Sequence, residues 1–281
     1  MSNTFNELLE SGAHFGHLKR KWNPAMAPYI YAEKNGIHII DLNKTVAKID
    51  EAAAALKQIA RSGKKILFVA TKKQAKDIVA EKVKAVGMPY VTERWPGGML
   101  TNFATIRKAV RKMSQIDKMA TDGTFENISK KEKLQITRER AKLEINLGSV
   151  ADLTRLPSAL FIVDITKEHI AVAEAKRLNI PTFAIVDTNS NPNFVDYAIP
   201  ANDDASTSVA YIVELMCKAI NEGLGDRKMD KEAIAADEKE GKNSKEEAEE
   251  LAEGLNVKGA KSDDEDGARK PAARKRTTAK K

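Results

Sequence analysis

Short apolar segments that alternate with helical patterns constrain the fold of this chain most strongly. They are IHIID at 37–41, KKILFVAT at 64–71, LFIVD at 160–164 and TFAIVD at 182–187. Strands that are apolar on both faces are typical of a parallel sheet covered by helices. The sequence therefore predicts an α/β fold with one parallel sheet flanked by helices, of the flavodoxin-like or Rossmann-like kind.

A helical hairpin interrupts this alternation. Its first half carries apolar or small residues at helical spacing, namely Ile106, Val110, Met113, Ile116 and Ala120. Its second half carries a facing set, namely Leu134, Ala141, Ile145 and Gly148, supplemented by Leu143 and Leu147. Ser129 and Glu132 form a capping box for the return helix. We expect an inserted antiparallel coiled coil. The alternative is a two-helix arm that serves for dimerisation.

The chain is expected to have three parts. Residues 1–101 and 155–225 form the α/β body, residues 102–154 form the arm, and residues 226–281 form a tail. A last helix from about Ala205 should end at Gly223 and Gly225. The tail has almost no aromatic or β-branched residues, so we expect a disordered charged extension.

Charge is distributed unevenly along the sequence. Residues 1–150 carry 27 basic and 15 acidic groups, residues 151–225 carry 5 and 10, and the tail is balanced. A net +12 beside a net −5 suits a protein that docks one side onto a polyphosphate surface. The alternative is ordinary solvated charge, and a coiled-coil adaptor without RNA would leave the net +12 unexplained.

The motifs of enzymes and membrane proteins are absent from the sequence. The α/β pattern suggests a nucleotide-dependent enzyme, but TKKQAKD follows ILFVAT where a glycine-rich phosphate loop would stand. We therefore predict no catalytic residues and no small-molecule substrate. No apolar run approaches the roughly 18 residues of a membrane span, so we expect a cytoplasmic protein without a membrane partner. The single Cys217 cannot form an intrachain disulfide.

Basic and aromatic residues are interleaved in two segments, 14–24 and 94–102, and segment 72–76 adds three lysines. Cations on phosphate with aromatic rings available for stacking are typical of RNA binding, and Lys72 and Lys73 are expected at a helix N-terminus that favours phosphate. The alternative is that Phe15 and Trp22 pack against the body while the cations are solvated. With the arm included, the candidate RNA-binding residues are Lys19, Arg20, Lys21, Trp22, Lys72, Lys73, Lys76, Arg94, Trp95, Asn102, Arg107, Lys108 and Arg111.

Three aspartates and a histidine are candidates for a metal site. Asp187 should lie at the carboxyl end of a strand, and chain order returns Asp203 and Asp204 to the same edge, near His17. Carboxylates with one imidazole are acceptable ligands of zinc or magnesium, so a structural ion is one hypothesis, although no cofactor is required. The alternative is that these aspartates cap a turn and the last helix.

Several long motifs resemble bacterial ribosomal protein S2. They are GAHFGHLKRKWNPAMAPYIY, IHIIDLNKT, ILFVATKKQA, RWPGGMLTN, and the run from LPSALFIVD through EAKRLNIPTFAIVDTNSNP to DYAIPANDD, and together they cover residues 1 to about 225. The resemblance implies a ribosome-bound, non-enzymatic constituent of the small subunit that binds small-subunit ribosomal RNA between head and body. It also implies contact with other small-subunit proteins, including the OB-domain protein that captures messenger RNA during translation.

Overall fold

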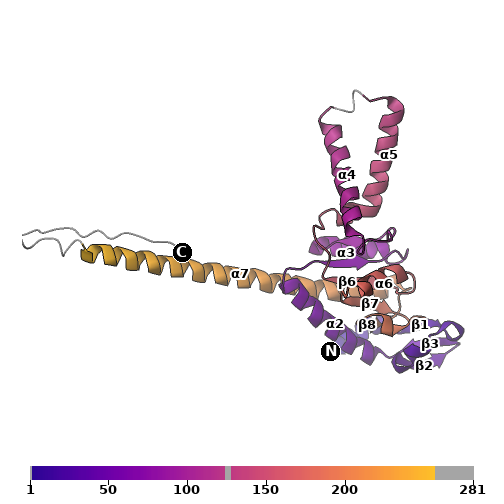
Figure 1. Ribbon diagram of the computed structural model, residues 1–281. Helices are drawn as coiled ribbons and strands as arrows, with labels where there is room; N and C mark the ends of the chain where they lie inside the picture. The colour runs from indigo at the N-terminus through magenta and orange to yellow at the C-terminus, as the bar shows by residue number, and fades with distance from the viewer. Residues whose placement is uncertain (1, 124–127, 257–281) are drawn as a thin grey trace, which may run out of the picture. The chain divides into compact units, whose positions relative to one another are not determined.

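The computed structural model describes residues 2–123 and 128–256 (Figure 1). The chain divides into two compact units, Met1–Met229 and Asp230–Lys281. Among the described residues, no helix combines the length and the apolar character that a membrane crossing requires.

A five-stranded parallel sheet forms the centre of the first unit. Its strands are β4 (Ile66–Val69), β5 (Tyr90–Val91), β6 (Ala159–Val163), β7 (Thr182–Val186) and β8 (Tyr197–Pro200). They lie in the order β5-β4-β6-β7-β8, and every neighbouring pair is parallel. The predicted parallel α/β sheet is confirmed.

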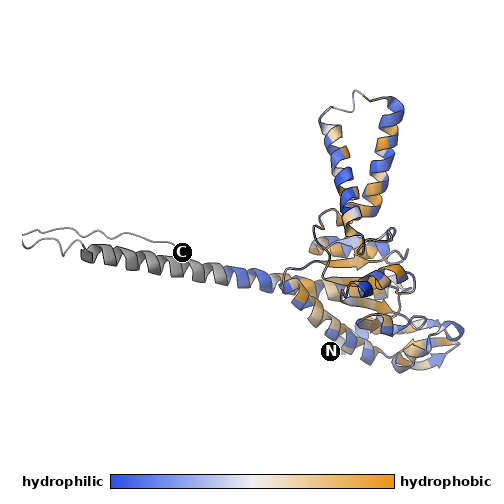
Figure 2. Ribbon diagram, viewed as in Figure 1, coloured by the Kyte–Doolittle hydropathy of each residue, from blue (hydrophilic) through white to orange (hydrophobic). Residues whose placement is uncertain are grey.

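Helices cover both faces of this sheet. Alternate strand residues point to opposite faces, so Phe68 and Phe161 lie in one apolar core while Leu67 and Leu160 lie in the other. The strands are coloured as hydrophobic segments in Figure 2. The first core, which contains Phe68 and Phe161, is completed by α1 (Ser2–Glu10), α2 (Leu42–Arg61), α3 (Lys76–Val86) and α7 (Ser206–Asn256). The second core is completed by α6 (His169–Arg177), by η4 (Gly148–Val150), and by those ends of α4 (Phe103–Thr121) and α5 (Lys130–Leu147) that lie nearest the sheet.

The first predicted strand lies in a different sheet. Residues Ile37–Ile40 form β3, which pairs antiparallel with β1 (Phe15–Leu18) and β2 (Ile30–Lys34). The expectation that it joins the parallel sheet was wrong. Its residues alternate between buried and half-buried, as in a strand with one face on a core, whereas β4 is buried throughout. The short helices η1 (Lys19–Lys21) and η2 (Pro24–Tyr29) lie between β1 and β2.

The starts of two helices bear on the predicted sites. Asp41 caps α2, because its Oδ1 accepts the N–H of Asn43 at 3.0 Å. Helix α3 begins at Lys76, later than the helix N-terminus expected at Lys72 and Lys73. Residues 72–75 form the turn before it, so Lys72 precedes the helix rather than lying in its first turn.

Along the chain, helices α4 and α5 come between β5 and β6, and the two helices lie next to each other (Figure 1). Two ion pairs join them, Lys112 with Glu139, and Arg140 with Asp117 at 2.7 Å. On α4 the expected stripe is buried at Val110, Met113 and Ile116.

The stripe predicted for α5 is wrong in part. Leu134 and Ile145 are exposed, while Leu143 and Leu147 pack towards the core. Arg140, which pairs with Asp117 of α4, lies on the same side of α5 as these two leucines, so the facing stripe is rotated from the predicted one. The Ser129 cap is present, with the Glu132 N–H at 3.4 Å from Ser129 Oγ.

The last helix does not end at the glycines. Helix α7 continues to Asn256, so the helix end expected at the glycines was wrong; residues 257–281 of the predicted tail lie outside the described residues. Neither Gly223 nor Gly225 has the positive φ of a left-handed cap. A Cβ on Gly223 would lie 2.4 Å from the carbonyl oxygen of Lys57, so this glycine permits α7 to approach α2. The Lys, Glu and Ala that follow are strong helix formers.

We predict opposite effects for alanine at these two glycines. Gly223→Ala should lower the free energy of unfolding by roughly 1–3 kcal/mol, because its methyl group would push α7 away from α2. Gly225→Ala is the matched control, since a Cβ there meets nothing within 4 Å. It should leave stability unchanged or raise it by up to about 1 kcal/mol through helix propensity. Urea denaturation measures both, and equal effects would contradict the proposed close approach.

Candidate functional site

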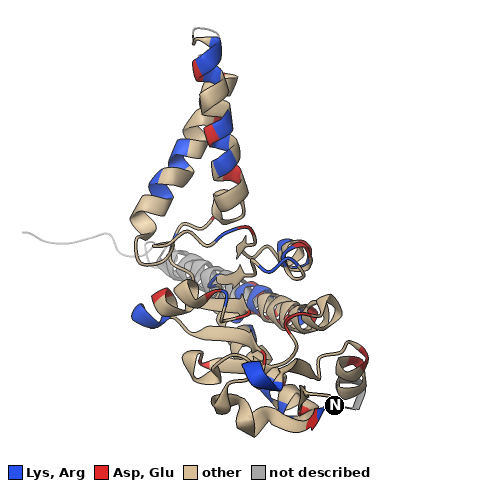
Figure 3. Cartoon of the chain, turned by 90° about the vertical axis from the view of Figure 1, so that its right-hand side faces the viewer, with Lys and Arg blue, Asp and Glu red and all other residues tan. Residues whose placement is uncertain are grey.

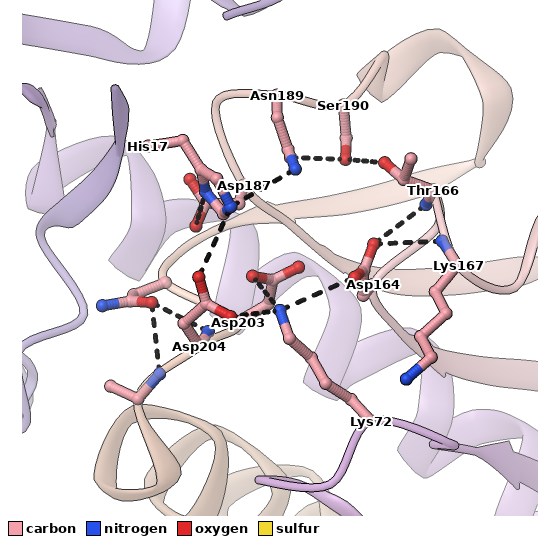
Figure 4. Close-up of polar contacts among 12 residues, drawn as sticks. His17, Lys72, Asp164, Thr166, Lys167, Asp187, Asn189, Ser190, Asp203 and Asp204 are labelled. Atoms are coloured by element: carbon pink, nitrogen blue, oxygen red, sulfur yellow. Dashed lines mark hydrogen bonds and ion pairs between the residues drawn. The ribbon is translucent and has the colours of Figure 1, made fainter. Parts of the chain in front are cut away.

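The carboxyl ends of four parallel strands bring charged side chains to one edge of the sheet (Figure 4). Lys72 follows β4, Asp164 follows β6, Asp187 follows β7, and Asp203 and Asp204 follow β8. In parallel sheets this edge is where ligand sites are built. The structure thus places four carboxylates at this edge, and three of them pair with the Lys72 ammonium group.

Lys72 is the cation at the centre of this cluster. Its Nζ lies 2.8 Å from Asp203 Oδ1, 2.7 Å from Asp204 Oδ1 and 3.6 Å from Asp164 Oδ2, and the side chain is only 12% exposed. Burial alone would lower the pKa of Lys72, but the hydrogen bonds and charges of the aspartates outweigh it and raise that pKa above its ordinary value. Burial would raise the pKa of Asp204, but its hydrogen bond and charge interaction with Lys72 outweigh burial, so that this pKa is lowered.

His17 connects the N-terminal sheet to the same cluster. Its Nδ1 lies 2.9 Å from Asp187 Oδ2, and its Nε2 lies 3.4 Å from Asp204 Oδ2. The hydrogen bond with Asp187 raises the pKa of His17 despite partial burial. The histidine is held in place because its backbone N–H donates to Thr188 Oγ1 at 2.8 Å. Gly16 is required for this contact, since a Cβ there would lie 2.6 Å from the Thr188 methyl carbon.

Asp203 is the most deeply buried carboxylate of the cluster. Burial, and then the negative charges of Asp187 and Asp164, raise its pKa to about 7. Its Oδ2 is buried without a hydrogen-bond partner among the described residues. Ligand atoms of His17, Asp187 and Asp203 lie within 4.8 Å of one another, a donor set that suits zinc.

The last helix is not capped by the aspartates. Asn202 Oδ1 accepts the N–H groups of Asp204 and Ala205, at 2.9 and 3.2 Å. Asp187 does accept from its neighbour, with Thr188 Oγ1 at 3.1 Å from its Oδ1. Capping therefore accounts for one oxygen of Asp187, and leaves Asp203 and Asp204 to the charge cluster.

The crevice between β4 and β6 is filled by the protein's own side chains. The chain leaves β4 for β5 on one side and returns to β6 on the other, so this is the switch point where doubly wound sheets bind nucleotides. Here the N–H and hydroxyl of Thr71 donate to Glu168 Oε1, and Lys72 pairs with Asp164. A phosphate group would meet paired, negatively charged groups instead of free amides.

A second carboxylate, Glu174 of α6, holds the segment that leads into α4. It accepts the Trp95 indole N–H at 3.2 Å and the backbone N–H groups of Gly98, Leu100 and Thr101 at 2.7, 2.9 and 3.0 Å. Burial raises the pKa of Glu174, but these hydrogen bonds outweigh it and the pKa lies below its ordinary value. The segment is thereby fixed by one ionised side chain.

Most of the candidate RNA-binding cations are exposed. Figure 3 shows basic residues distributed along α4 and α5. Among the described residues, the structure gives no ion pair for the exposed Arg20, Lys21, Lys73, Arg94, Lys108 and Arg111. These cations are therefore available to a polyanion. Asn102 is also exposed, and its Oδ1 accepts the Thr105 hydroxyl at 2.8 Å.

The remaining candidates are engaged within the protein. Lys19 pairs with Glu33 at 2.7 Å and Lys76 with Glu93 at 3.1 Å. Arg107 donates to the carbonyl oxygens of Ala151 and Leu153, at 3.3 and 3.1 Å. Trp95 is 6% exposed and Lys72 lies in the carboxylate cluster, so their predicted RNA contacts find no support in this geometry. Trp22 is 37% exposed, with its ring 5.2 Å from that of His38.

Half of the carboxylates counted for residues 151–225 lie inside the protein. Five of these ten carboxylates are buried, namely Asp164, Glu168, Glu174, Asp187 and Asp203. Each has an ion pair or hydrogen bond inside the protein. A count of charges along the sequence does not distinguish these interior carboxylates from exposed ones.

Sequence reasoning missed Glu174, Glu168 and Asp164. Asp164 directly follows an apolar strand, as Asp187 does, so the same strand-end argument could have identified it. Its φ of +67° is a further sign of a specially held residue. Glu174 and Glu168 have no sequence signal, because their partners lie far away along the chain.

This geometry defines an α/β protein whose strand-end crevice is closed by its own side chains and whose unpaired cations lie outside it. Comparisons with known proteins give its family. The profile of ribosomal protein S2 matches residues 8–223. Small ribosomal subunit protein uS2 of Parabacteroides distasonis is 71% identical over 235 residues, which is 83% of this chain and 84% of the relative. The protein of that name in Porphyromonas gingivalis is 72% identical over 228 residues, 81% of each chain.

The chain belongs to the ribosomal protein S2 family. It is accordingly a structural constituent of the small ribosomal subunit and not an enzyme. The closed crevice gives a physical reason why the chain is not an enzyme, since the place where related sheets hold nucleotides is filled by Lys72, Thr71 and their carboxylate partners.

Glu174→Gln should loosen the segment that Glu174 holds. A neutral amide has one acceptor oxygen and would direct an NH₂ group at backbone donors, so we expect a loss of about 1–3 kcal/mol in the free energy of unfolding. Glu81→Gln on the exposed face of α3 is the matched control and should be neutral.

The pH dependence tests the same contact. The pKa of Glu174 is lowered in the folded state, so its stabilisation is complete above the unfolded value of about 4.5 and is lost as pH falls through the lower folded value. The difference between the original protein and Glu174→Gln should therefore shrink below pH 4.5. A difference that stayed constant down to the acid transition would contradict the role of the ionised carboxylate.

Proposed function

We propose that this chain binds small-subunit ribosomal RNA, between head and body of the subunit, through its unpaired exposed cations. The observation that carries the proposal is the separation of charge. Lys72, His17 and the buried carboxylates neutralise one another inside, whereas Arg20, Lys21 and the other unpaired cations face outward. Phosphate contacts of this kind supply most of the affinity for RNA. The site of action is accordingly cytoplasmic and ribosome-bound.

The arm contributes to this surface in the proposal. Helices α4 and α5 would act as an antiparallel coiled coil whose outer cations, Lys108 and Arg111 among them, contact RNA backbone. The two interhelical ion pairs support the pairing, and the exposure of these cations supports their accessibility. Dimerisation through the arm remains the competing role, and a monomer in sedimentation at micromolar concentration would exclude it.

The N-terminal sheet would help to dock the OB-domain ribosomal protein that captures messenger RNA. Phe15, Leu18 and Tyr31 are exposed apolar residues on β1 and β2, and His17 fixes β1 to the charge cluster. Exposed apolar side chains on one small sheet are suited to protein contact. This docking function requires the sheet to be held firmly at the strand-end edge.

A structural zinc or magnesium ion would strengthen that attachment. His17, Asp187 and Asp203 offer the ligand atoms, and the orphaned Asp203 Oδ2 supports a further cation at the site. Asp204 is the weaker candidate because Lys72 binds its Oδ1. The ion would supply positive charge between carboxylates that otherwise repel one another; it would hold the docking surface and take part in no reaction.

Neighbouring lysines separate the two kinds of cation experimentally. Lys73→Gln should reduce the slope of log affinity for subunit RNA against log salt by roughly one unit, because an exposed phosphate contact is lost. Lys72→Gln should instead lower the free energy of unfolding by roughly 3 kcal/mol, since partly buried carboxylates lose their counter-charge. Lys48→Gln, at a lysine paired with Glu51 on α2, is the control for both. An unchanged salt slope in Lys73→Gln would remove that residue from the RNA surface.

Metal content tests the proposed ion. Extensively dialysed protein should retain stoichiometric zinc or magnesium in elemental analysis, and His17→Ala should lose it because one of three ligands is gone. His169→Ala removes an exposed imidazole that lies outside this ligand set and should retain the ion. Dialysed protein without a stoichiometric divalent ion would end the metal proposal while leaving RNA binding untouched.

A further inference from the structure

A groove of about 480 Å³ lies beside the charge cluster, between α6 and the segment that follows β7. Figure 4 shows its inner wall, where Thr166, Ser190 and Asn189 are joined by hydrogen bonds of 2.7 and 2.9 Å. None of its lining residues is a proposed metal ligand or one of the cations used above, although Asn189 Nδ2 lies 3.5 Å from His17 Nε2. It is lined by Asn23, Ile165, Thr166, His169, Val172, Ala173, Lys176, Asn189, Ser190, Asn191 and Phe194.

The floor of the groove is apolar and one wall is aromatic. Ile165 and Val172 are buried in the second core, and Ala173 lies beside them on α6. Phe194 ends the short helix η5 (Pro192–Phe194) and is 56% exposed, although it lines the groove. A phenyl ring with this much free surface in an apolar slot is suited to stacking against a flat ligand.

The rim of the groove carries hydrogen-bond donors. Asn23 Oδ1 accepts the Ala25 N–H at 2.9 Å, and Asn191 Oδ1 accepts the Asn193 N–H at 3.0 Å. Both side-chain oxygens are therefore used in local turns, and the structure gives no partner, among the described residues, for either NH₂ group. Lys176 adds an exposed ammonium group. The oxygens of Thr166, Ser190 and Asn189 are already bonded to one another.

Among the residues that the structure describes, no carboxylate lines this groove. The acids next to lining residues in sequence, Asp164, Glu168 and Glu174, are buried and have partners inside the protein. A larger groove at the base of α5 differs in this respect, since Glu93, Glu144 and Asp152 line it. The groove beside α6 therefore carries a charge that accepts a polyanion.

We propose that this groove binds one unstacked base of a single-stranded RNA segment, with guanine or uracil preferred. The base would stack on Phe194, two of its acceptor atoms would accept from the NH₂ groups of Asn23 and Asn191, and Lys176 would face the neighbouring phosphate. Guanine offers O6 with N7, and uracil offers O4 with O2, whereas adenine and cytosine carry an amino group in the position of O6 or O4. The proposal rests on the proposed RNA binding and names a base-specific contact within it.

A peptide would match the groove less well. A peptide backbone carries an N–H donor for every carbonyl acceptor, and burying such donors without partners is costly. The side-chain oxygens around the groove are mostly taken, so donors of a peptide would remain unpaired. An acceptor-bearing base with an adjoining phosphate satisfies the donor-rich rim.

Isosteric substitutions test the base contact in the full-length protein. Asn191→Asp keeps an oxygen for the Asn193 N–H but replaces the NH₂ donor with an acceptor, so the turn should persist while the contact is lost. Binding of short labelled oligouridine, followed by fluorescence anisotropy at fixed salt, should weaken roughly tenfold, and the preference for oligouridine over oligocytidine should vanish. Phe194→Leu should weaken binding by roughly tenfold without changing this preference much. Asn193→Asp introduces the same charge outside this groove and should retain the preference.

Ultraviolet crosslinking in reconstituted small subunits separates this proposal from the general one. We expect a guanosine or uridine adduct on the peptide that contains Phe194. Adducts on the arm or on the N-terminal segment without one at Phe194 would overturn the groove and leave RNA binding intact. Complete absence of adducts would sink both proposals. A crosslink from Phe194 to a neighbouring protein, or equal binding of all homopolymers by the original protein, would also overturn the base contact.

Discussion

The ionic contact between Lys72 and the aspartates of neighbouring strand ends is the constraint on which the rest of this structure depends. Parallel strands deliver their following residues to one edge, so Asp164, Asp203 and Asp204 meet there whatever their chemistry. Carboxylates held this close repel one another, and burial adds to the cost of their charge. Lys72 compensates from inside the cluster, and His17 adds a second contact that attaches the N-terminal sheet.

This arrangement also explains how an α/β sheet serves as a scaffold. In doubly wound enzymes the switch-point crevice stays open for a ligand, whereas here the Lys72 and Thr71 contacts close it. Glu174 plays a comparable part on the other side of α6, where one carboxylate organises the segment that leads into α4. The buried carboxylates are thus paired inside the body, and the exposed cations remain available to a polyanionic partner.

Much of the sheet followed from the sequence. The apolar segments at 160–164 and 182–187 predicted buried parallel strands, because a strand covered on both faces has no room for polar residues. The gathering of His17, Asp187 and Asp203 was also anticipated, since chain order alone returns the strand ends to one edge. The pattern at 37–41 misled, because a strand of a small antiparallel sheet is equally apolar over so few residues.

By itself, then, the sequence determined which segments are strands and helices, which family the chain resembles, and which strand ends carry carboxylates, because these depend on local periodicity and chain order. Tertiary structure alone decided that Lys72 turns inward, that half of the acids of residues 151–225 are buried, and that Gly223 serves a helix contact instead of a helix end. The physical reason is that pairing and burial depend on neighbours distant in the chain. Asp203 lies 131 residues from the lysine that neutralises it, and no local pattern records that distance.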